Sequence, residues 1–457
     1  MTTPPSNTAP GALPRRIGLW SAIAVVVGSA IGSGIFRSPA GIADRVPGPL
    51  PLLSLWVIGG LISLCGALTL AEVASEVPKT GGIYAFLKEG WGRLPAFLFG
   101  WAQLTVVRAA ALGAISITFA QYFWRVFGYD PTIAPYDAWA RYTAAGAIVL
   151  TAAFNIRGVR MGSAVVNVTT VAKTAGLALI IILALTLGLG RTGGNFTPAM
   201  PLEAVPLTAY GAALVSLLWA YDGWMDLSYV AGEVKDPEKN MPRALIFGTL
   251  AIITVFVLAN VAYLAVLPIE EMRTSKLVAA DVAERLMGQG GVTFVAITVM
   301  ASTFGTLNAV LLTSPRILFA AAADGMLFKD IARVHPTYQT PYIAISLVAV
   351  LGMIFVLFLT FEKLADAFVF AMLPFYALGV AVVYRLRSRP GYTPKYRTPG
   401  YPVVPAIFII AVAYLLVNGL IDPQTRGWTL GIFGVLLLGI PVFKLLVEGR
   451  PGNSSSR

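Results

Sequence analysis

Long runs of apolar residues, separated by short polar connectors, make up most of the chain. A helix needs about 20 mostly apolar residues to cross the hydrocarbon core of a membrane. Backbone polar groups cannot remain unpaired in lipid, so the runs are expected to be helices, and the alternation typical of an outer-membrane barrel is absent. The pattern predicts twelve spans, at residues 17–36, 46–71, 94–124, 142–156, 161–190, 204–221, 244–269, 286–315, 334–361, 367–384, 398–421 and 427–443.

The composition agrees with a membrane protein and excludes several other classes. Of the 457 residues, 57% are hydrophobic and only 12% are charged, whereas a soluble protein carries about 25% charged residues. The net charge of +11 would favour nucleic acid as a partner only if the basic residues gathered on a polar face, but they punctuate the apolar runs. A single cysteine, Cys65, excludes an internal disulfide and a cysteine-cluster metal site, and we expect no metal or cofactor.

The basic residues also predict the orientation of the spans. If the N-terminus lies inside, the inner connectors and tails hold about twice as many Lys and Arg residues as the outer ones. We therefore expect a multi-pass protein of the plasma (inner) membrane with both termini cytoplasmic. Residues 1–14 are expected to be a disordered leader, because the apolar run after them is too long for a signal peptide. Residues 449–457 are expected to form a cytoplasmic tail.

The first span contains the segment Gly32-Ser33-Gly34, which we interpret as a break in the helix. Each glycine costs a helix about 1 kcal/mol relative to alanine. Close helix packing would explain Gly28 with Gly32, but not a second glycine two residues later. A break creates free N–H groups that suit a carboxylate and free carbonyls that suit an ammonium group. A free amino acid carries both charges.

The sixth span predicts a second break, at Asp222 and Gly223. A carboxylate inside a membrane span is costly unless it faces a polar cavity. Internally duplicated transporters carry such breaks at matching places in their two halves. The spacing therefore predicts a five-plus-five inverted repeat, with residues 15–200 as the first repeat, 201–390 as the second, and two further spans within 391–448.

These motifs resemble the amino acid–polyamine–organocation (APC) superfamily, in particular the L-type amino acid transporter branch and its bacterial permeases. The resemblance covers about residues 15 to 445. It implies an all-α membrane fold of the LeuT type, with broken helices 1 and 6, that works by alternating access. The matching segments are Gly32–Phe36, Ala71–Val73, Pro78–Tyr84, Trp219–Trp224, Gly232-Glu233, Asn240–Ala244, Ser302–Gly305 and Ser314–Arg316.

The resemblance also implies a substrate site at the two breaks. The substrate carboxylate would meet the backbone N–H groups of Ser33 and Gly34, and its amino group the carbonyls of Ala30, Trp219 and Asp222. Trp219 would cover the site as a lid, although packing in the core is the plainer interpretation of this residue. The candidate substrate-binding residues are Ala30, Gly32, Ser33, Gly34, Trp219, Ala220 and Asp222.

Two basic residues lie deep inside predicted spans. Lys173 is 12 residues beyond Met161, about 18 Å along a helix and hence near the midplane. In sodium-independent members of the superfamily a lysine here stands where related symporters bind sodium. Its expected partners are carbonyls at the first break and the hydroxyls of Ser302 and Thr306. Proton coupling and a permanently charged strut both remain open, and Arg108 has no assigned role beyond orienting a polar interior.

The predicted function is secondary active transport of free amino acids, by sodium-independent proton symport or exchange. A polyamine or organocation permease of the same fold is the alternative, because Asp222 does not decide between cationic and neutral substrates. A channel would show a ring of charges or a carbonyl filter, and a membrane-embedded enzyme would show a cluster of catalytic residues. Heavy-chain-linked relatives carry a cysteine in the connection around residues 124–139, which has none here. We therefore expect a monomer without a disulfide-linked heavy chain.

Overall fold

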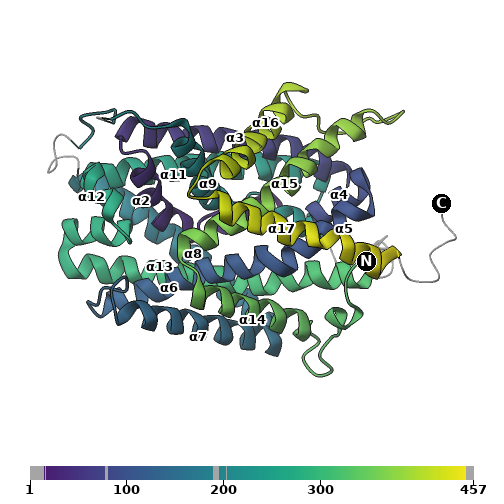
Figure 1. Ribbon diagram of the computed structural model, residues 1–457, viewed down its shortest axis with the longest axis horizontal. Helices are drawn as coiled ribbons and strands as arrows, with labels where there is room; N and C mark the ends of the chain where they lie inside the picture. The colour runs from purple at the N-terminus through teal and green to yellow at the C-terminus, as the bar shows by residue number, and fades with distance from the viewer. Residues whose placement is uncertain (1–14, 16, 78–80, 189–194, 202, 449–457) are drawn as a thin grey trace, which may run out of the picture.

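The computed structural model describes residues 15, 17–77, 81–188, 195–201 and 203–448, and within these residues the chain is helical without a β-sheet. Most of the long helices run roughly along the long axis of the molecule (Figure 1), as in a bundle that crosses a membrane. The all-α fold class is confirmed. The predicted leader, residues 1–14, and the predicted tail, residues 449–457, lie outside the described residues.

The first part of the chain forms eight α-helices and two π-helical turns. They are α1 (Leu19–Ala30), α2 (Gly34–Arg45), α3 (Pro49–Glu76), α4 (Ile83–Trp91), α5 (Arg93–Ala102), η1 (Gln103–Val107), α6 (Arg108–Val126), α7 (Tyr136–Arg157), α8 (Val159–Leu183) and η2 (Ala184–Gly188). The turn η1 joins α5 and α6 into one long helical span.

The second part begins at residue 207 and carries the remaining helices. They are α9 (Leu207–Tyr221), α10 (Asp226–Tyr229), η3 (Ala231–Glu233), α11 (Pro237–Val266), α12 (Ile269–Thr274), α13 (Val278–Ala323), η4 (Lys329–Ala332), α14 (Tyr342–Phe358), α15 (Phe361–Arg387), α16 (Val403–Ile421), α17 (Arg426–Phe443) and η5 (Lys444–Glu448). The element α13 consists of two helices joined at a kink, because Gly288 has a φ of 61°.

Among the described residues, eight helices are long and apolar enough to cross a membrane, or nine if α1 and α2 form one bent span. Two predicted spans appear as shorter apolar helices. The helix α9 stops at Tyr221, because the chain turns away at Asp222, and α14 begins only after Pro341, which cannot donate a backbone N–H to a preceding turn. The count of twelve spans and the five-plus-five repeat stay predictions.

The span formed by α5, η1 and α6 lies at the centre of the bundle. Its apolar segment is 89% buried, whereas that of α17 is 22% buried, so α17 presents most of its surface to the surroundings. The helix α6 packs against α7, α13, α14 and α15. Residues of α6 therefore belong to the interior, and a charged side chain there requires a polar neighbour.

A buried ion pair joins α3 to the end of α15 and the connection that follows. The Glu72 side chain is completely buried and accepts hydrogen bonds from Arg387 Nε at 2.9 Å and Arg387 Nη2 at 2.7 Å. The backbone N–H of Thr398 adds a third bond, at 2.7 Å. The hydroxyl of Tyr392 adds a fourth, at 3.3 Å. Both lone pairs that a bidentate arginine leaves open are thus offered a donor, which is what a buried carboxylate requires.

Candidate functional site

The chain is interrupted at both places that the sequence predicts. The helix α1 ends at Ala30 and α2 begins at Gly34, with a bend of 45° between them. The helix α9 ends at Tyr221 and α10 begins at Asp226. We call residues 31–33 the first break and residues 222–225 the second break. Gly223 has a φ of 114°, a conformation that side chains other than hydrogen rarely tolerate.

Glycines hold the two breaks in direct backbone contact. A Cβ atom added to Gly34 would lie 2.4 Å from Cα of Ala220, and one added to Gly223 would lie 2.7 Å from the backbone N of Ala30. Neither space accepts a methyl group, since carbon atoms in contact are about 3.5–4.0 Å apart. Each break is therefore packed against the main chain of the helix that leads into the other.

A small cavity of about 70 Å³ lies where the two breaks meet. It has room for only a few water molecules, so the site is small in this conformation. Six of the seven predicted substrate-binding residues line it, and Ala220 lies behind Gly34 instead. The lining residues are Ser29, Ala30, Gly32, Ser33, Gly34, Arg108, Ala111, Ile115, Trp219, Asp222, Gly223, Asp226, Thr306, Val310 and Phe368.

The backbone at the first break offers both kinds of polar group. Gly34 begins α2, and the first N–H groups of a helix have no acceptor within it. At the other side, the carbonyl of Ala30 accepts from the N–H of Gly32 at 2.8 Å. A carbonyl oxygen has two lone pairs, so this bond leaves one of them for a second donor. Donors for an anion and acceptors for a cation thus lie within one short segment.

Trp219 lines the cavity and packs against two aromatic rings. Its side chain is buried, and its ring meets Phe368 edge to face at 5.0 Å and Phe361 at 6.2 Å between ring centroids. The guanidinium of Arg37 lies 4.6 Å from the centre of the Phe361 ring and pairs with Glu362 at 3.4 Å. The indole N–H of Trp219 has no acceptor among the described residues. The lid role expected for Trp219 stays a prediction.

Lys173 reaches the end of α1 rather than the cavity itself. Its side chain is buried, and its ammonium group donates to the carbonyl of Gly28. Ser302 donates to the carbonyl of Ile31 at 3.4 Å, and Thr306 donates to the carbonyl of Ser302 at 2.9 Å. The lysine thus bonds to a carbonyl within α1 rather than within the first break, and the two hydroxyls bond to main-chain carbonyls, so the expected set of partners differs in detail. Thr306 also lines the cavity.

Sequence reasoning assigned no function to two charged residues that line the cavity, Arg108 and Asp226. Asp226 follows Asp222 by four residues across the second break, and this repetition of acids in one interrupted span was the available signal. Arg108 was recognised as deep in its span, but its direction depends on the helix geometry around it. The hydroxyl of Tyr376, from α15, donates to Asp222, and no sequence pattern linked these two residues.

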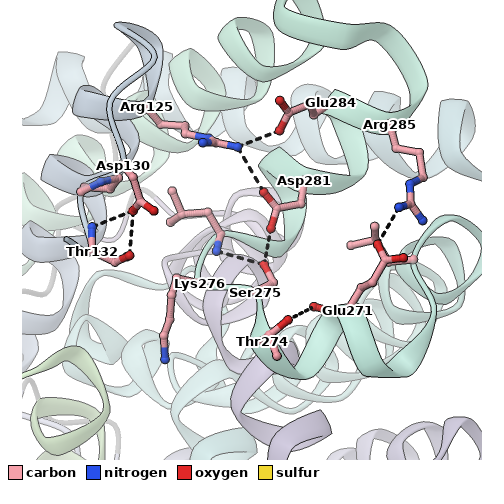
Figure 2. Close-up of a pocket in the computed structure, with 13 residues that line it drawn as sticks. Arg125, Asp130, Thr132, Glu271, Thr274, Ser275, Lys276, Asp281, Glu284 and Arg285 are labelled. Carbon is pink, nitrogen blue, oxygen red and sulfur yellow. Dashed lines mark hydrogen bonds and ion pairs between the residues drawn. The ribbon is translucent and has the colours of Figure 1, made fainter.

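A larger cavity of about 520 Å³ lies apart from the breaks, between the connection after α6 and the helices α12 and α13. Figure 2 shows Arg125 reaching toward Asp281 and Glu284, and Arg285 toward Glu271. The Arg125–Glu284 and Arg285–Glu271 pairs are 2.7 Å and 2.6 Å long. Its charged groups largely pair with one another, and none of the predicted site residues lines it.

The family model that describes amino acid permeases matches residues 17–441, a range that contains both breaks. The chain belongs to the amino acid permease family. It is 32% identical over 441 residues to the serine/threonine exchanger SteT of Bacillus subtilis (strain 168), which covers 96% of this chain and 98% of the relative. It is 30% identical to the human b(0,+)-type amino acid transporter 1, over 96% of this chain and 89% of the relative.

A third relative is the human large neutral amino acids transporter small subunit 2, which is 32% identical over 95% of this chain and 81% of the relative. The predicted resemblance to the APC superfamily and its L-type branch is confirmed. Because the relatives are transporters and exchangers, the chain is a membrane transport protein and not an enzyme.

Proposed function

We propose that the chain is a secondary active transporter that carries free amino acids across the plasma membrane by alternating access. One observation carries this proposal: two interrupted helices, in direct backbone contact at Gly34 and Gly223, meet around a small cavity. Backbone N–H groups and carbonyls converge there away from lipid, as an unwound segment in a membrane requires. The match to a family of amino acid permeases supports the same substrate class.

The residues around the cavity then divide the substrate between them. The first turn of α2, at Ser33 and Gly34, suits the substrate carboxylate, because N–H groups and the positive end of the helix dipole both favour an anion. The carbonyls of Ala30, Trp219 and Asp222 suit the amino group. A polyamine has no carboxylate for the N–H groups of α2, so the arrangement supports an amino acid over a polyamine.

The small volume of the cavity favours a substrate with a small side chain. A volume of about 70 Å³ leaves little space beyond the backbone of an amino acid, and the walls at Gly32, Thr306 and Val310 come from two different helical segments that would have to separate for a larger substrate. SteT, the relative that matches nearly end to end, is a serine/threonine exchanger. We therefore infer a preference for small amino acids.

Lys173 supports transport without sodium. Its ammonium group holds the carbonyl of Gly28 at the end of α1, and a fixed positive charge there opposes a cation site. Two roles of the lysine are possible: a permanent positive charge that holds α1, or a group that releases its proton. The variant Lys173→Arg distinguishes them, because arginine keeps its charge throughout the working pH range. A strut predicts that uptake by this variant retains the pH profile of the wild type, and proton release predicts that the profile flattens.

The same proposal includes the topology. Both termini lie in the cytoplasm, in accord with the distribution of Lys and Arg, and residues 15–200 and 201–390 are the two inverted repeats. The chain works as a monomer without a disulfide-linked heavy chain. Its single cysteine, Cys65, lies within α3 and not in the connection between α6 and α7.

Reconstitution into proteoliposomes tests the function directly. A thermal-shift screen of the purified protein against the twenty amino acids and common polyamines first identifies ligands, since a ligand that binds the folded state raises its stability. Labelled uptake of the best amino acid should be saturable and stereoselective, and should proceed without ATP or a sodium gradient. Uptake that strictly requires sodium would contradict the role of Lys173, and uptake that does not saturate would favour a channel.

A further inference from the structure

The wall of the cavity carries an uneven set of charges. Among the described residues that line it, the ionisable side chains are Asp222, Asp226 and Arg108. Asp222 belongs to the second break, Asp226 is the first residue of α10, and Arg108 is the first residue of α6. Lys173 is buried behind α1, on the carbonyl of Gly28, and does not line the cavity.

A π-helical turn sets the position of Arg108. The turn η1 ends one residue before it, so the backbone N–H of Arg108 bonds to the carbonyl of Gln103, five residues earlier. The same turn brings the two side chains together, and Nε of Arg108 donates to Oε1 of Gln103 at 2.6 Å. Gln103 is fully buried and is itself held by a contact with Met372 at 3.2 Å. Single π-helical turns inside α-helices are frequent at functional sites.

Arg108 shares the cavity wall with Asp222 of the second break and Asp226 of α10. The guanidinium carbon lies 5.8 Å from the centre of the ring of Tyr229, the last residue of α10. Asp226 interacts electrostatically with Arg108 and with Ser29 of α1, and Asp222 interacts with both Asp226 and Arg108. The bond to Gln103 uses Nε, and the guanidinium also reaches the Tyr229 side chain, so Arg108 is held at the cavity wall from two sides.

The balance of charge follows from these positions. With both acids ionised, two carboxylates face one guanidinium, and the site has a formal charge of minus one. Inside a membrane protein such a charge is weakly screened and acts strongly on any ligand. A zwitterionic amino acid leaves the balance unchanged. An amino acid with an anionic side chain would bring the formal charge to minus two, and one with a cationic side chain would bring it to zero.

We propose that Asp226 is a specificity-determining residue, whose charge adds to that of Asp222 and outweighs that of Arg108 at the cavity wall, thereby excluding amino acids with anionic side chains from the transport site, and that Gln103 is the positioning residue for Arg108. The inference rests on the proposed function, because it concerns the same cavity. Without Asp226, the charge of Arg108 would balance that of Asp222, and the site would become electrically neutral toward a carboxylate on the side chain of a substrate.

Charge-changing variants test this inference in detergent solution. The reference ligand is the neutral amino acid that gives the largest thermal shift with the wild type, and the probe is L-aspartate. We expect the wild type to bind the reference and to reject L-aspartate. Asp226→Asn should raise the affinity for L-aspartate relative to the reference at least tenfold, whereas Asp226→Glu, which keeps the charge, should continue to reject it.

The double variant Arg108→Gln/Asp226→Asn is the decisive control, because it restores the charge of minus one and should again reject L-aspartate. Gln103→Met combined with Asp226→Asn should lower the gain in L-aspartate affinity while leaving the reference affinity in place. Should Asp226→Asn not fold, Arg108→Gln alone gives a site with a charge of minus two, and its affinity for L-lysine relative to the reference should rise at least tenfold.

The outcomes separate this inference from the proposed function. If the wild type binds no amino acid, the proposed function fails. If Asp226→Asn binds the reference as the wild type does and still rejects L-aspartate, or if the double variant accepts L-aspartate as well as the single variant, the role of Asp226 is overturned while transport of amino acids stands. An unchanged preference for L-lysine in Arg108→Gln would overturn it in the same way.

Discussion

Replacing Gly34 with alanine tests the contact on which the site depends. The added Cβ would lie 2.4 Å from Cα and 2.7 Å from Cβ of Ala220, whereas carbon atoms in ordinary contact are about 3.5–4.0 Å apart. Neither atom belongs to a flexible side chain, so the main chain of α2 or α9 must move by about 1 Å to make room. That movement displaces the N–H groups that would hold the substrate carboxylate.

The expected cost can be stated as a loss of affinity. Forcing an extra methyl group into a packed interior costs about 1–3 kcal/mol. If this cost falls on the closed form that holds the substrate, the affinity decreases by about 5- to 150-fold. Gly41→Ala provides a matched control in the same helix, because an added Cβ there would meet none of the described atoms within 4 Å and Gly41 does not line the cavity. We expect nearly wild-type affinity in that variant.

The assay measures the dissociation constant of the best amino acid by thermal shift, and then its uptake into proteoliposomes. Size-exclusion chromatography in detergent first establishes that both glycine variants are folded. Equal affinities for the wild type and a folded Gly34→Ala variant would show that the site does not need the backbone contact, and the geometric reasoning would be refuted. A strong loss in Gly41→Ala would refute it as well, because that variant introduces no close contact.

Three further variants probe other parts of the structure. Trp219→Ala should impair uptake by at least tenfold while expression is retained, because it removes the ring between the cavity and Phe361, and wild-type uptake would count against a covering role. Lys173→Met should abolish uptake by releasing the carbonyl of Gly28, which a flux assay at saturating substrate would detect. Arg387→Met should lower the midpoint of thermal unfolding strongly, since an unpaired buried carboxylate costs about 3–5 kcal/mol. Much of that loss should return when Glu72→Gln is added, and a double variant no more stable than the single one would contradict the buried-charge explanation.

The sequence was most informative where residue type and backbone geometry are tied together. Two glycines around a serine predicted the first break, and the structure interrupts the helix between Ala30 and Gly34. An aspartate followed by a glycine predicted the second break, where Gly223 takes a φ that suits glycine. In both cases the local chemistry is costly in a continuous membrane helix, so it could be recognised without knowing what lies beside it.

Other features depend on contacts between distant parts of the chain. Arg108 could be recognised as deep in its span, but its direction follows from a π-helical turn that leaves no clear trace in the order of residues. The partner of Glu72 lies more than three hundred residues away, at Arg387. The shortening of α14 could have been anticipated from Pro336 and Pro341, because proline within a predicted span favours a later helix start.

The two interrupted helices pack directly against each other, Gly34 on Ala220 and Gly223 on Ala30. This packing has a mechanical consequence. Neither interrupted helix can move without displacing the other, so we expect the two to move as one rigid unit. Conformational change during the transport cycle must then concentrate at the contacts of this unit with its surroundings. These are the hydrogen bond of Lys173 to α1 and the packing of the Phe361 and Phe368 rings against Trp219. Substitutions of Lys173, Phe361 or Phe368 should alter the rate of the transport cycle more than its substrate specificity.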